Sequence, residues 1–536
     1  MRNCITILFS FLFTASLLGT GLAQDASTTQ EPSQPVNVLT YHDDIQRTGL
    51  TRVETILTPS NVNSASFGKV NFLSTDGKVD GEPLYLSNVA INGLSHNVVY
   101  GVTEHDSVYA FDADTGSQLW RVSALLQGES PSDDHGCDQI SPEIGITDTP
   151  VIDPTKGLHG AIYFVAMSKD SNGKYHQRLH ALDVATHAEL FGGPTEIQAK
   201  YPGTGDNSQN GFVIFDPGQY AERVGLLESQ GEIFLGWTSH CDQRPYTGWL
   251  MAYSSSTLQQ LSVLNLTPNG NEGSIWQSGA GIAADSFGNL YFLDANGTFD
   301  TTLDSNGFPI NGDFGNAFIK VATSNKLVVS DYFATYNTVQ ESDADIDLGS
   351  GGALVLDIPG SGTQTVRLVV GAGKDHNIYV ANRDNMGKFN PNNNNALFQE
   401  LVGALPNGAW SMPAYFHNNV YFGGVGDHIK AYPIVFGRLA TQPSSQTSTT
   451  FTYPGATPGV SANLSLSGIL WAVENSNPAV LHAYNALDLT RELYNSNQQG
   501  SRDQFGPGNK FITPMIANGK VFVGTQTGVA VFGLLH

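Results

Sequence analysis

The 536-residue chain has little positive charge, few cysteines and only one long apolar run. Lys and Arg number 25 against 49 Asp and Glu, which gives a formal net charge of −24. This balance argues against nucleic acid or an anionic membrane as a partner. A small acidic substrate would therefore need a local cationic pocket. Only 14% of the residues are charged, whereas Gly numbers 58, a composition typical of an all-β protein.

The one apolar run is at the N-terminus. Residues 1–23 combine a basic residue, an apolar stretch and a small-residue end, which predicts a secretory signal peptide. We therefore expect a secreted, extracellular protein. Residues 24–36 are rich in Ser, Thr, Gln and Pro and predict a disordered linker before a single domain at 37–536. Sequons that suit a secretory route begin at Asn265, Asn296 and Asn463.

Two cysteines remain after the predicted signal peptide, Cys137 and Cys241. In an exported protein the default interpretation is one disulfide between them. A metal-binding or free-thiol role is the alternative.

The rest of the chain is repetitive. Eight units of short strands and regular turns follow one another, from VVYGVTEHDSVYAFDADTGSQLW to the C-terminal KVFVGTQTGVAVFGLL. This repetition predicts an all-β fold, a single β-propeller of eight four-stranded blades. The last unit lacks its fourth strand, and residues 67–77 (FGKVNFLSTDG) have the pattern to supply it and close the ring. Seven blades is the alternative.

The connections between strands fall into two classes. Within a unit of strands A to D, the A–B and C–D turns are short hairpins, whereas the B–C and D–A loops are long and polar. The two classes exit on opposite faces of a propeller, so most unusual polar residues should share one face. Loops held on a rigid scaffold commonly carry function.

The repeats resemble the quinoprotein-alcohol-dehydrogenase-like propeller superfamily, and AFDADTGSQLW at 110–120 is similar to its tryptophan-docking motif. Quinone-binding members carry two adjacent cysteines, and this chain has no such pair, so no pyrroloquinoline quinone is expected. Five blocks more closely resemble secreted polysaccharide lyases of family 27: YHDDIQRTG, TEHDSVYAFDADTG, PEIGITDTPVID, SHCDQRPYTGW and SIWQSGAG.

That resemblance implies an enzyme that removes terminal rhamnose from rhamnosyl-α-1,4-glucuronate ends of gum arabic and related arabinogalactans by β-elimination. Its partner would be an acidic plant polysaccharide, and we expect a monomer. The reaction needs a cation or strong donor for the uronate carboxylate, a base for the C5 proton and an acid for the leaving oxygen.

His105 is the first candidate for the base, with Glu104 and Asp106 expected to orient its imidazole. A second candidate loop offers His240 and Tyr246 for proton transfer and Arg244 as a carboxylate clamp. For each, a purely structural role between blades is the alternative. Further candidates for substrate binding on the same face are His135, Lys374, His376, Trp276 and Trp410.

Three acidic residues alternate in ESDADIDLGSGG: Asp343, Asp345 and Asp347. The spacing is compatible with a structural Ca²⁺ site, but an EF-hand's glycine and terminal glutamate are missing, so a solvated acidic loop is the preferred interpretation. No other cofactor is expected. The competing functions are a non-catalytic propeller that binds a glycan or protein, a quinone-dependent oxidoreductase and a glycoside hydrolase.

Overall fold

The computed structural model describes residues 36–360 and 364–535. The predicted signal peptide and the linker up to residue 35 lie outside the described residues. The described chain forms one unit that begins at Val36. None of its helices is long and apolar enough to span a bilayer.

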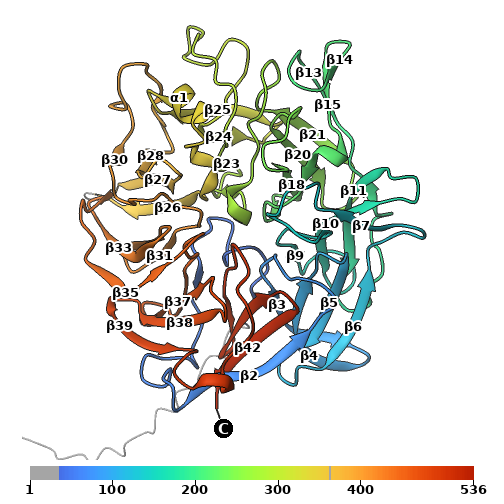
Figure 1. Ribbon diagram of the computed structural model, residues 1–536, viewed down its shortest axis with the longest axis vertical. Helices are drawn as coiled ribbons and strands as arrows, with labels where there is room; N and C mark the ends of the chain where they lie inside the picture. Colours follow the sequence, from blue (N-terminus) through green and yellow to red (C-terminus); the bar gives the residue numbers. More distant parts are fainter. Residues whose placement is uncertain (1–35, 361–363, 536) are drawn as a thin grey trace, which may run out of the picture. The chain divides into compact units, whose positions relative to one another are not determined.

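Eight antiparallel sheets stand around a central axis in the described part of the chain, as Figure 1 shows. Each sheet is one blade, and its strands are named below in order from the innermost, next to the axis, to the outermost. Blades 1 to 4 consist of β3 (Leu84–Ile91), β4 (Leu94–Val102), β5 (Ser107–Asp112) and β6 (Gln118–Ser123); β9 (Val151–Asp153), β10 (Ala161–Lys169), β11 (Tyr175–Asp183) and β12 (Thr195–Glu196); β17 (Leu227–Ser229), β18 (Glu232–Gly236), β20 (Trp249–Ser254) and β21 (Gln260–Asn265); β22 (Ala283–Ala284), β23 (Leu290–Leu293), β24 (Phe318–Ala322) and β25 (Val328–Ala334).

The second half of the ring repeats this plan. Blades 5 to 8 consist of β26 (Leu354–Pro359), β27 (Thr365–Ala372), β28 (Ile378–Asn382) and β30 (Gln399–Leu401); β31 (Ala414–Phe416), β32 (Asn419–Gly423), β33 (Asp427–Val435) and β35 (Ser445–Phe451); β36 (Gly459–Asn463), β37 (Leu466–Glu474), β38 (Val480–Asn485) and β39 (Asp488–Asn495); β40 (Met515–Ala517), β41 (Lys520–Thr525), β42 (Gly528–Leu534) and β2 (Phe67–Ser74).

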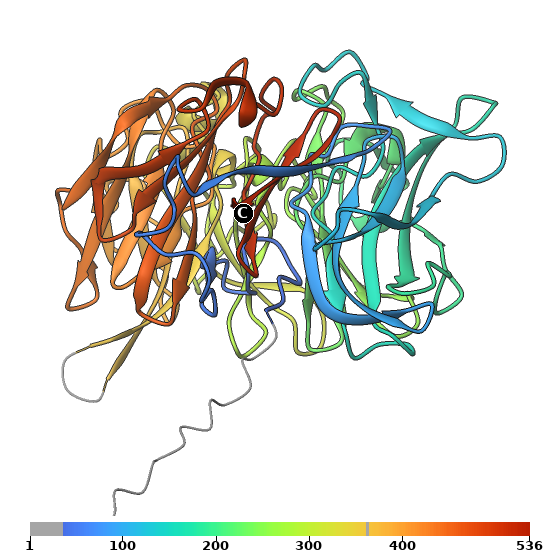
Figure 2. The same cartoon turned by 90° about the horizontal axis from the view of Figure 1, so that it is seen from below.

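The ring closes as the sequence predicted. Strand β2 pairs antiparallel with β42, from Phe67 opposite Leu534 to Ser74 opposite Gly528. Figures 1 and 2 show this blue N-terminal strand beside the red C-terminal one. The eight-blade prediction is therefore confirmed, and the seven-blade alternative is wrong.

Smaller elements decorate the blades, mostly as pieces of the long loops. They are β1 (Leu50–Thr51), β7 (Ser130–Asp133), β8 (Glu143–Ile144), β13 (Lys200–Pro202), β14 (Ser208–Gln209), β15 (Phe212–Ile214), β16 (Tyr220–Ala221), β19 (Thr238–Ser239), β29 (Lys388–Phe389), β34 (Arg438–Leu439), α1 (Thr338–Asp343), η1 (Pro217–Gln219), η2 (Gln277–Gly279), η3 (Leu348–Ser350) and η4 (Gly500–Arg502).

The hydrophobic core is divided among the seams between blades, because each sheet packs apolar side chains on both faces. The cluster of Leu84, Val98 and Ile162 joins blades 1 and 2. The cluster of Tyr85, Val99 and Phe522 joins blades 8 and 1 across the closure. At the first seam the indole of Trp120 donates to the Val184 carbonyl at 3.2 Å.

An N-terminal segment, residues 38–51, runs around the axis inside the ring (Figure 1). It bonds to all eight blades in order. The partners, from blade 1 to blade 8, are Val38 with Tyr85, Leu39 with Ile152, Thr40 with Leu226, Ile45 with Ala284, Gln46 with Val355, Thr48 with Tyr415, Gly49 with Val460 and Thr51 with Ile516. We call these residues the axial segment; it includes the YHDDIQRTG block.

Arg47 anchors this segment and is fully buried. Its guanidinium donates to the Ile282 carbonyl at 2.9 Å, to the Tyr41 carbonyl and the Thr40 hydroxyl at 2.7 Å, and to the Leu226 carbonyl at 3.2 Å. Burial lowers the pKa of Arg47 to about 10, so the side chain remains charged at neutral pH.

Two of the three sequons are incompatible with a glycan in the folded protein. Asn265 is 2% exposed and donates to Thr247 Oγ1 at 2.8 Å, and Asn296 is 7% exposed and donates to Asp345 at 2.8 Å. Asn463 is exposed at a hairpin end. The prediction of glycosylation is thus corrected for the first two and stays open for Asn463.

Replacing Arg47 by methionine should lower the free energy of unfolding by about 3 kcal/mol or more, because several buried acceptors then lose their donor. Urea unfolding followed by far-ultraviolet circular dichroism measures the change. The exposed Arg52 is the matched control, and Arg52→Met should leave stability within about 0.5 kcal/mol of wild type. Equal losses in both variants would contradict the anchoring role.

Stability should fall as pH rises from about 4 to about 7. Burial raises the pKa of Asp43, Asp148 and Glu341 to about 7 and that of Asp313 and Asp375 to about 6. In this window the folded state binds more protons than the unfolded chain, so the stabilisation present at low pH is lost as these groups ionise. Urea midpoints at about pH 4.5 and 7.5 test the sign; a higher midpoint at the higher pH would refute it.

Candidate functional site

A cavity of about 360 Å³ opens on the face that carries the B–C and D–A loops. Its lining residues come from loops of blades 1 to 8, which meet around the axis. They are Cys137, Gln139, Ile140, Ile144, Arg223, Thr238, Ser239, His240, Cys241, Asp242, Ser274, Trp276, Ala295, Asn296, Asp345, Asp347, Lys374, Trp410, Tyr453 and Phe511. The predicted gathering of polar loop residues on one face is therefore seen in the structure.

Four aromatic side chains form an arc along one side of the cavity. Ring centroids are 6.1 Å apart between Trp276 and Phe511, 6.3 Å between Phe511 and Tyr453, and 6.0 Å between Tyr453 and Trp410, with near-perpendicular planes. Each ring comes from the D–A loop of a different blade. Both predicted tryptophans thus lie where a sugar ring could contact them.

Lys374 carries one of the two cations of the cavity. Its ammonium pairs with Asp347 at 2.7 Å and with Asp345, and it lies 5.8 Å from the Trp276 ring centroid. Burial opposes the charge, but Asp347 and Asp345 outweigh it, and the pKa of Lys374 is raised. This cation is therefore already neutralised by carboxylates of the chain.

Arg223 is the second cation and is only 5% exposed. Its guanidinium lies 4.7 Å from the Phe511 ring centroid and donates to the Gln139 carbonyl at 3.4 Å. Within residues 36–360 and 364–535, no carboxylate lies within 4.0 Å of it. Asp80, whose carboxyl feels the Arg223 charge, is paired with Lys78 at 3.0 Å. A buried cation without a counter-ion favours an anionic ligand.

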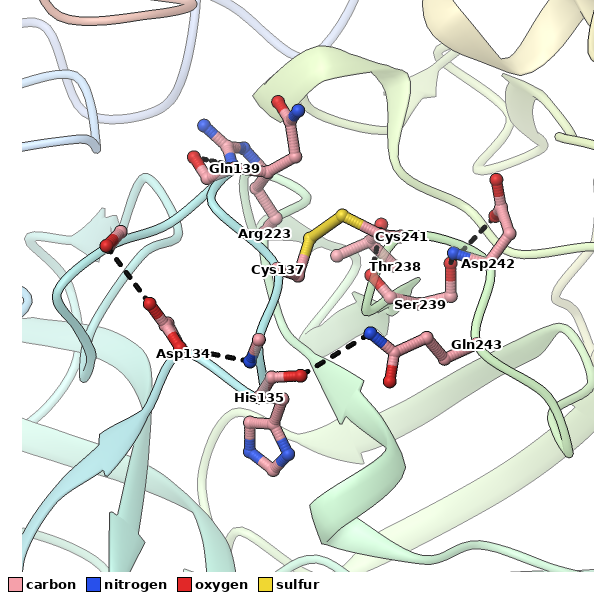
Figure 3. The surroundings of a disulfide bond; sticks show 12 residues. Asp134, His135, Cys137, Gln139, Arg223, Thr238, Ser239, Cys241, Asp242 and Gln243 are labelled. Atoms are coloured by element: carbon pink, nitrogen blue, oxygen red, sulfur yellow. Dashed lines mark hydrogen bonds between the residues drawn. A yellow bond between two sulfur atoms is a disulfide. The ribbon is translucent and has the colours of Figure 1, made fainter.

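The predicted disulfide is confirmed and forms part of the cavity wall. Cys137 and Cys241 are bonded, with Cα atoms 5.7 Å apart across a sequence separation of 104 residues. Figure 3 shows the bond tying the loop of Gln139 to the loop of Asp242, with Arg223 close by. The cross-link thereby holds two loops from different blades at the edge of the same cavity.

His240 lines the cavity beside this disulfide and stacks on His135, with ring centroids 4.1 Å apart. Burial, together with His135, lowers the pKa of His240 to about 3, and burial also lowers the pKa of His135. His240 Nε2 is buried and has no hydrogen-bond partner among the described residues. The ring is neutral, and such a low pKa makes it a weak proton acceptor.

His105 lies outside the cavity lining, and its side chain is 43% exposed. The expected orienting residues do not hold it. Glu104 is buried and accepts from Gly145 N–H and the Thr147 hydroxyl, both at 2.9 Å, and Asp106 is also buried. Instead His105 Nδ1 bonds to Glu143 Oε1 at 3.0 Å. Glu143 therefore fixes the orientation of the imidazole, and neither residue is part of the cavity lining.

The structure corrects three further expectations. Arg244 is half exposed and forms a bidentate pair with Asp206 at 2.7 and 2.8 Å, so its guanidinium is not a free clamp. Tyr246 is fully buried, with its hydroxyl on Asp242 at 2.8 Å. His376 bonds through Nδ1 to a backbone carbonyl and lies outside the cavity lining.

The three alternating aspartates differ in their contacts. Asp345 and Asp347 both bind Lys374, and Asp343 is exposed at the end of α1. Among residues 36–360 and 364–535, no three His, Cys, Asp or Glu side chains are arranged to hold a metal ion. The ammonium of Lys374 pairs with the two carboxylates that a metal ion would need.

Sequence reasoning missed Arg223, Tyr453 and Phe511. A signal was present, because an aromatic residue stands shortly before the innermost strand in SIWQSGAG, NGAWSMP, FTYPGATPG and NKFITPM. Aligning these D–A loops would have placed all four aromatic residues together. For Arg223 we find no comparable signal.

No family model and no curated protein matches the chain. Solved structures do resemble it. A quinohemoprotein alcohol dehydrogenase from Pseudomonas putida is 14% identical with a TM-score of 0.62, covering 94% of this chain and 80% of that one. The quinohemoprotein alcohol dehydrogenase from Comamonas testosteroni is 14% identical with a TM-score of 0.59, covering 93% of this chain and 80% of that one. A europium-containing methanol dehydrogenase is 11% identical with a TM-score of 0.58, covering 94% of this chain and 98% of that one.

These likenesses show that the chain has the fold of the quinoprotein dehydrogenase propellers, as its tryptophan-docking motif predicted. At identities of 11–14% the likenesses show the fold and not the function.

Replacing Lys374 by methionine should lower the free energy of unfolding by about 3 kcal/mol near pH 7.5, because the buried Asp347 loses its partner. The loss should be smaller near pH 5, where Asp347, whose pKa burial already raises, can take up a proton. Chemical unfolding at both pH values tests this. Lys326→Met, at an exposed turn, is the control and should be neutral.

Proposed function

We propose that the chain is a secreted polysaccharide lyase that binds an acidic sugar end in the axial cavity. The substrate class is the rhamnosyl-α-1,4-glucuronate end of arabinogalactans such as gum arabic, from which the enzyme releases rhamnose. The observation that carries the proposal is Arg223, a buried cation in an aromatic-lined cavity with no carboxylate of the described residues within 4.0 Å.

The polar groups of the cavity complement a uronic acid, which has one carboxylate and several hydroxyls. Arg223 supplies a guanidinium for the carboxylate, with one N–H group already donating to the Gln139 carbonyl. Asp242, Asp345 and the Asn296 carbonyl oxygen, which is buried and unpaired among the described residues, supply acceptors for hydroxyls. A neutral sugar would leave Arg223 without a counter-ion, and a purely anionic ligand would face these acceptors unfavourably.

In the proposed reaction the C5–H bond of the uronate breaks, a C4–C5 double bond forms and the C4–O4 bond breaks. The leaving oxygen takes a proton. Neutralising the carboxylate with Arg223 stabilises the carbanion-like state. Burial raises the pKa of Tyr453, with Arg223 and Lys374 opposing the rise, so its hydroxyl is protonated and within electrostatic reach of both cations. Tyr453 is therefore our candidate for the acid that protonates the leaving oxygen.

For the base we propose His105, with Glu143 holding its tautomer. Its imidazole is oriented by Glu143 and is accessible. His240 is the alternative, because it lines the cavity with a free Nε2, although its pKa of about 3 is far from that of an efficient base near neutral pH.

The quinone oxidoreductase alternative agrees with the fold of the structural neighbours. It is the less favoured function because the two cysteines are 104 residues apart and belong to two loops rather than to an adjacent pair. Dye reduction that depends on added quinone would favour it. Glycan binding without product formation would instead favour a non-catalytic propeller.

Incubation of the secreted protein with gum arabic should release rhamnose and produce the ultraviolet absorbance of an unsaturated uronate. Arg223→Gln should reduce kcat/KM by about 100-fold or more, because the carboxylate loses its charge partner. Arg52→Gln, on the surface, is the matched control and should retain full activity. Rhamnose release without the absorbance change would indicate a hydrolase, and no release would sink the proposal.

His105→Ala should lower kcat by about 100-fold or more with little change in KM, as expected for loss of a general base. His240→Gln should cost less than about 10-fold, because a histidine of such low pKa contributes little to proton transfer. The reverse order in initial-rate measurements would assign the base to His240. Glu143→Gln should fall between them, since it only orients the imidazole.

A further inference from the structure

Phe511 borders the main cavity and two small cavities next to it. Its ring lines the axial cavity of about 360 Å³ and also two satellite cavities of about 10 Å³ each. One satellite is lined by Tyr41 and Glu82 next to the axial segment, and the other by Asn509 and Val473 on the blade 7 side. Among the described residues, Phe511 is the one lining residue that all three cavities share, while Arg223 also borders the first satellite and Trp410 the second.

The backbone at this position is strained. Phe511 has a φ of +66°, in the left-handed region that a bulky side chain rarely adopts. Such a conformation costs on the order of 1–3 kcal/mol and persists where the surroundings hold it, often at functional sites. A glycine or asparagine would satisfy the same backbone with less strain. The presence of a phenylalanine therefore points to a role for the ring.

The ring also fixes the position of Arg223. The guanidinium lies 4.7 Å from the Phe511 centroid, and the ring is bracketed by Trp276 at 6.1 Å and Tyr453 at 6.3 Å. Arg223 and Phe511 therefore pack together as one unit. A carboxylate that binds Arg223 is therefore held at a fixed distance from the Phe511 ring.

We propose that Phe511 is a specificity-determining residue, whose ring closes the floor of the cavity and limits how much of a sugar chain fits beyond the bound uronate. This inference rests on the proposed use of the cavity for acidic sugars. In this proposal Arg223 fixes the carboxylate, and the Phe511 ring limits the space on the O4 side of the uronate to one sugar. A longer cap would have to displace the ring.

The test measures binding by calorimetry in a His105→Ala, His240→Gln background, in which neither candidate proton acceptor remains and both ligands persist. One ligand is glucuronate with a single rhamnose on O4, and the other carries a further sugar on that rhamnose. The background protein should bind the shorter ligand at least about 10-fold more tightly. Adding Phe511→Gly should shrink this ratio at least about three-fold, because the three cavities merge.

Phe436→Gly is the matched control. Phe436 has a φ of +52°, is 86% exposed and lines none of the three cavities, so the same substitution relieves similar backbone strain without opening the floor. It should leave the ratio unchanged. Phe511→Asn, which also tolerates a positive φ, replaces Phe511→Gly if that variant does not fold.

An unchanged ratio in the folded Phe511 variant, or equal binding of both ligands by the background protein, would overturn the assignment. Because the readout is binding, it is separate from the activity test. A protein that discriminates between the ligands but releases no rhamnose would retain the floor role of Phe511 and lose the lyase function.

Discussion

The hydrogen bonds between the axial segment and the innermost strand region of every blade are the constraint on which the rest of the molecule depends. A propeller ring closed only by β2 and β42 would leave the inner edges of its blades facing an open channel. The axial segment meets those edges one blade at a time, and Arg47 satisfies carbonyls from blades 3 and 4. The axial segment therefore fills the channel between the blades.

That filling also determines the chemistry available above it. Because the residues around the axis are buried, charges near it must be paired or neutralised. Lys374 meets this demand with Asp345 and Asp347, whereas Arg223 rests on an aromatic ring and lacks an acidic partner in the described chain. Lys374 and Arg223 therefore differ in how directly the described chain pairs their charge, and this difference is the physical basis of the proposed preference for an anionic group.

Features that repeat along the chain could be predicted from the sequence, and features that join distant loops could not. The blade count, the closing strand β2 and the gathering of polar loops on one face follow from periodicity. The Cys137–Cys241 disulfide follows from the number of cysteines. Arg244 was misassigned because its partner Asp206 lies 38 residues away in another loop. The axial segment was visible only as a motif, since its bonds reach eight blades spread over the whole chain.

The same reasoning explains why sequence neighbours were poor guides to the surroundings of His105. Asp106 has a φ of +53°, a tight turn that directs the chain back into strand β5, and both acidic neighbours are buried in the blade. The imidazole is held by Glu143, which arrives from the next D–A loop. In this propeller the cavity is lined by side chains from loops of many blades, so a site is assembled across blades. Its signal in a sequence is one residue per repeat, as the arc that contains Phe511 illustrates.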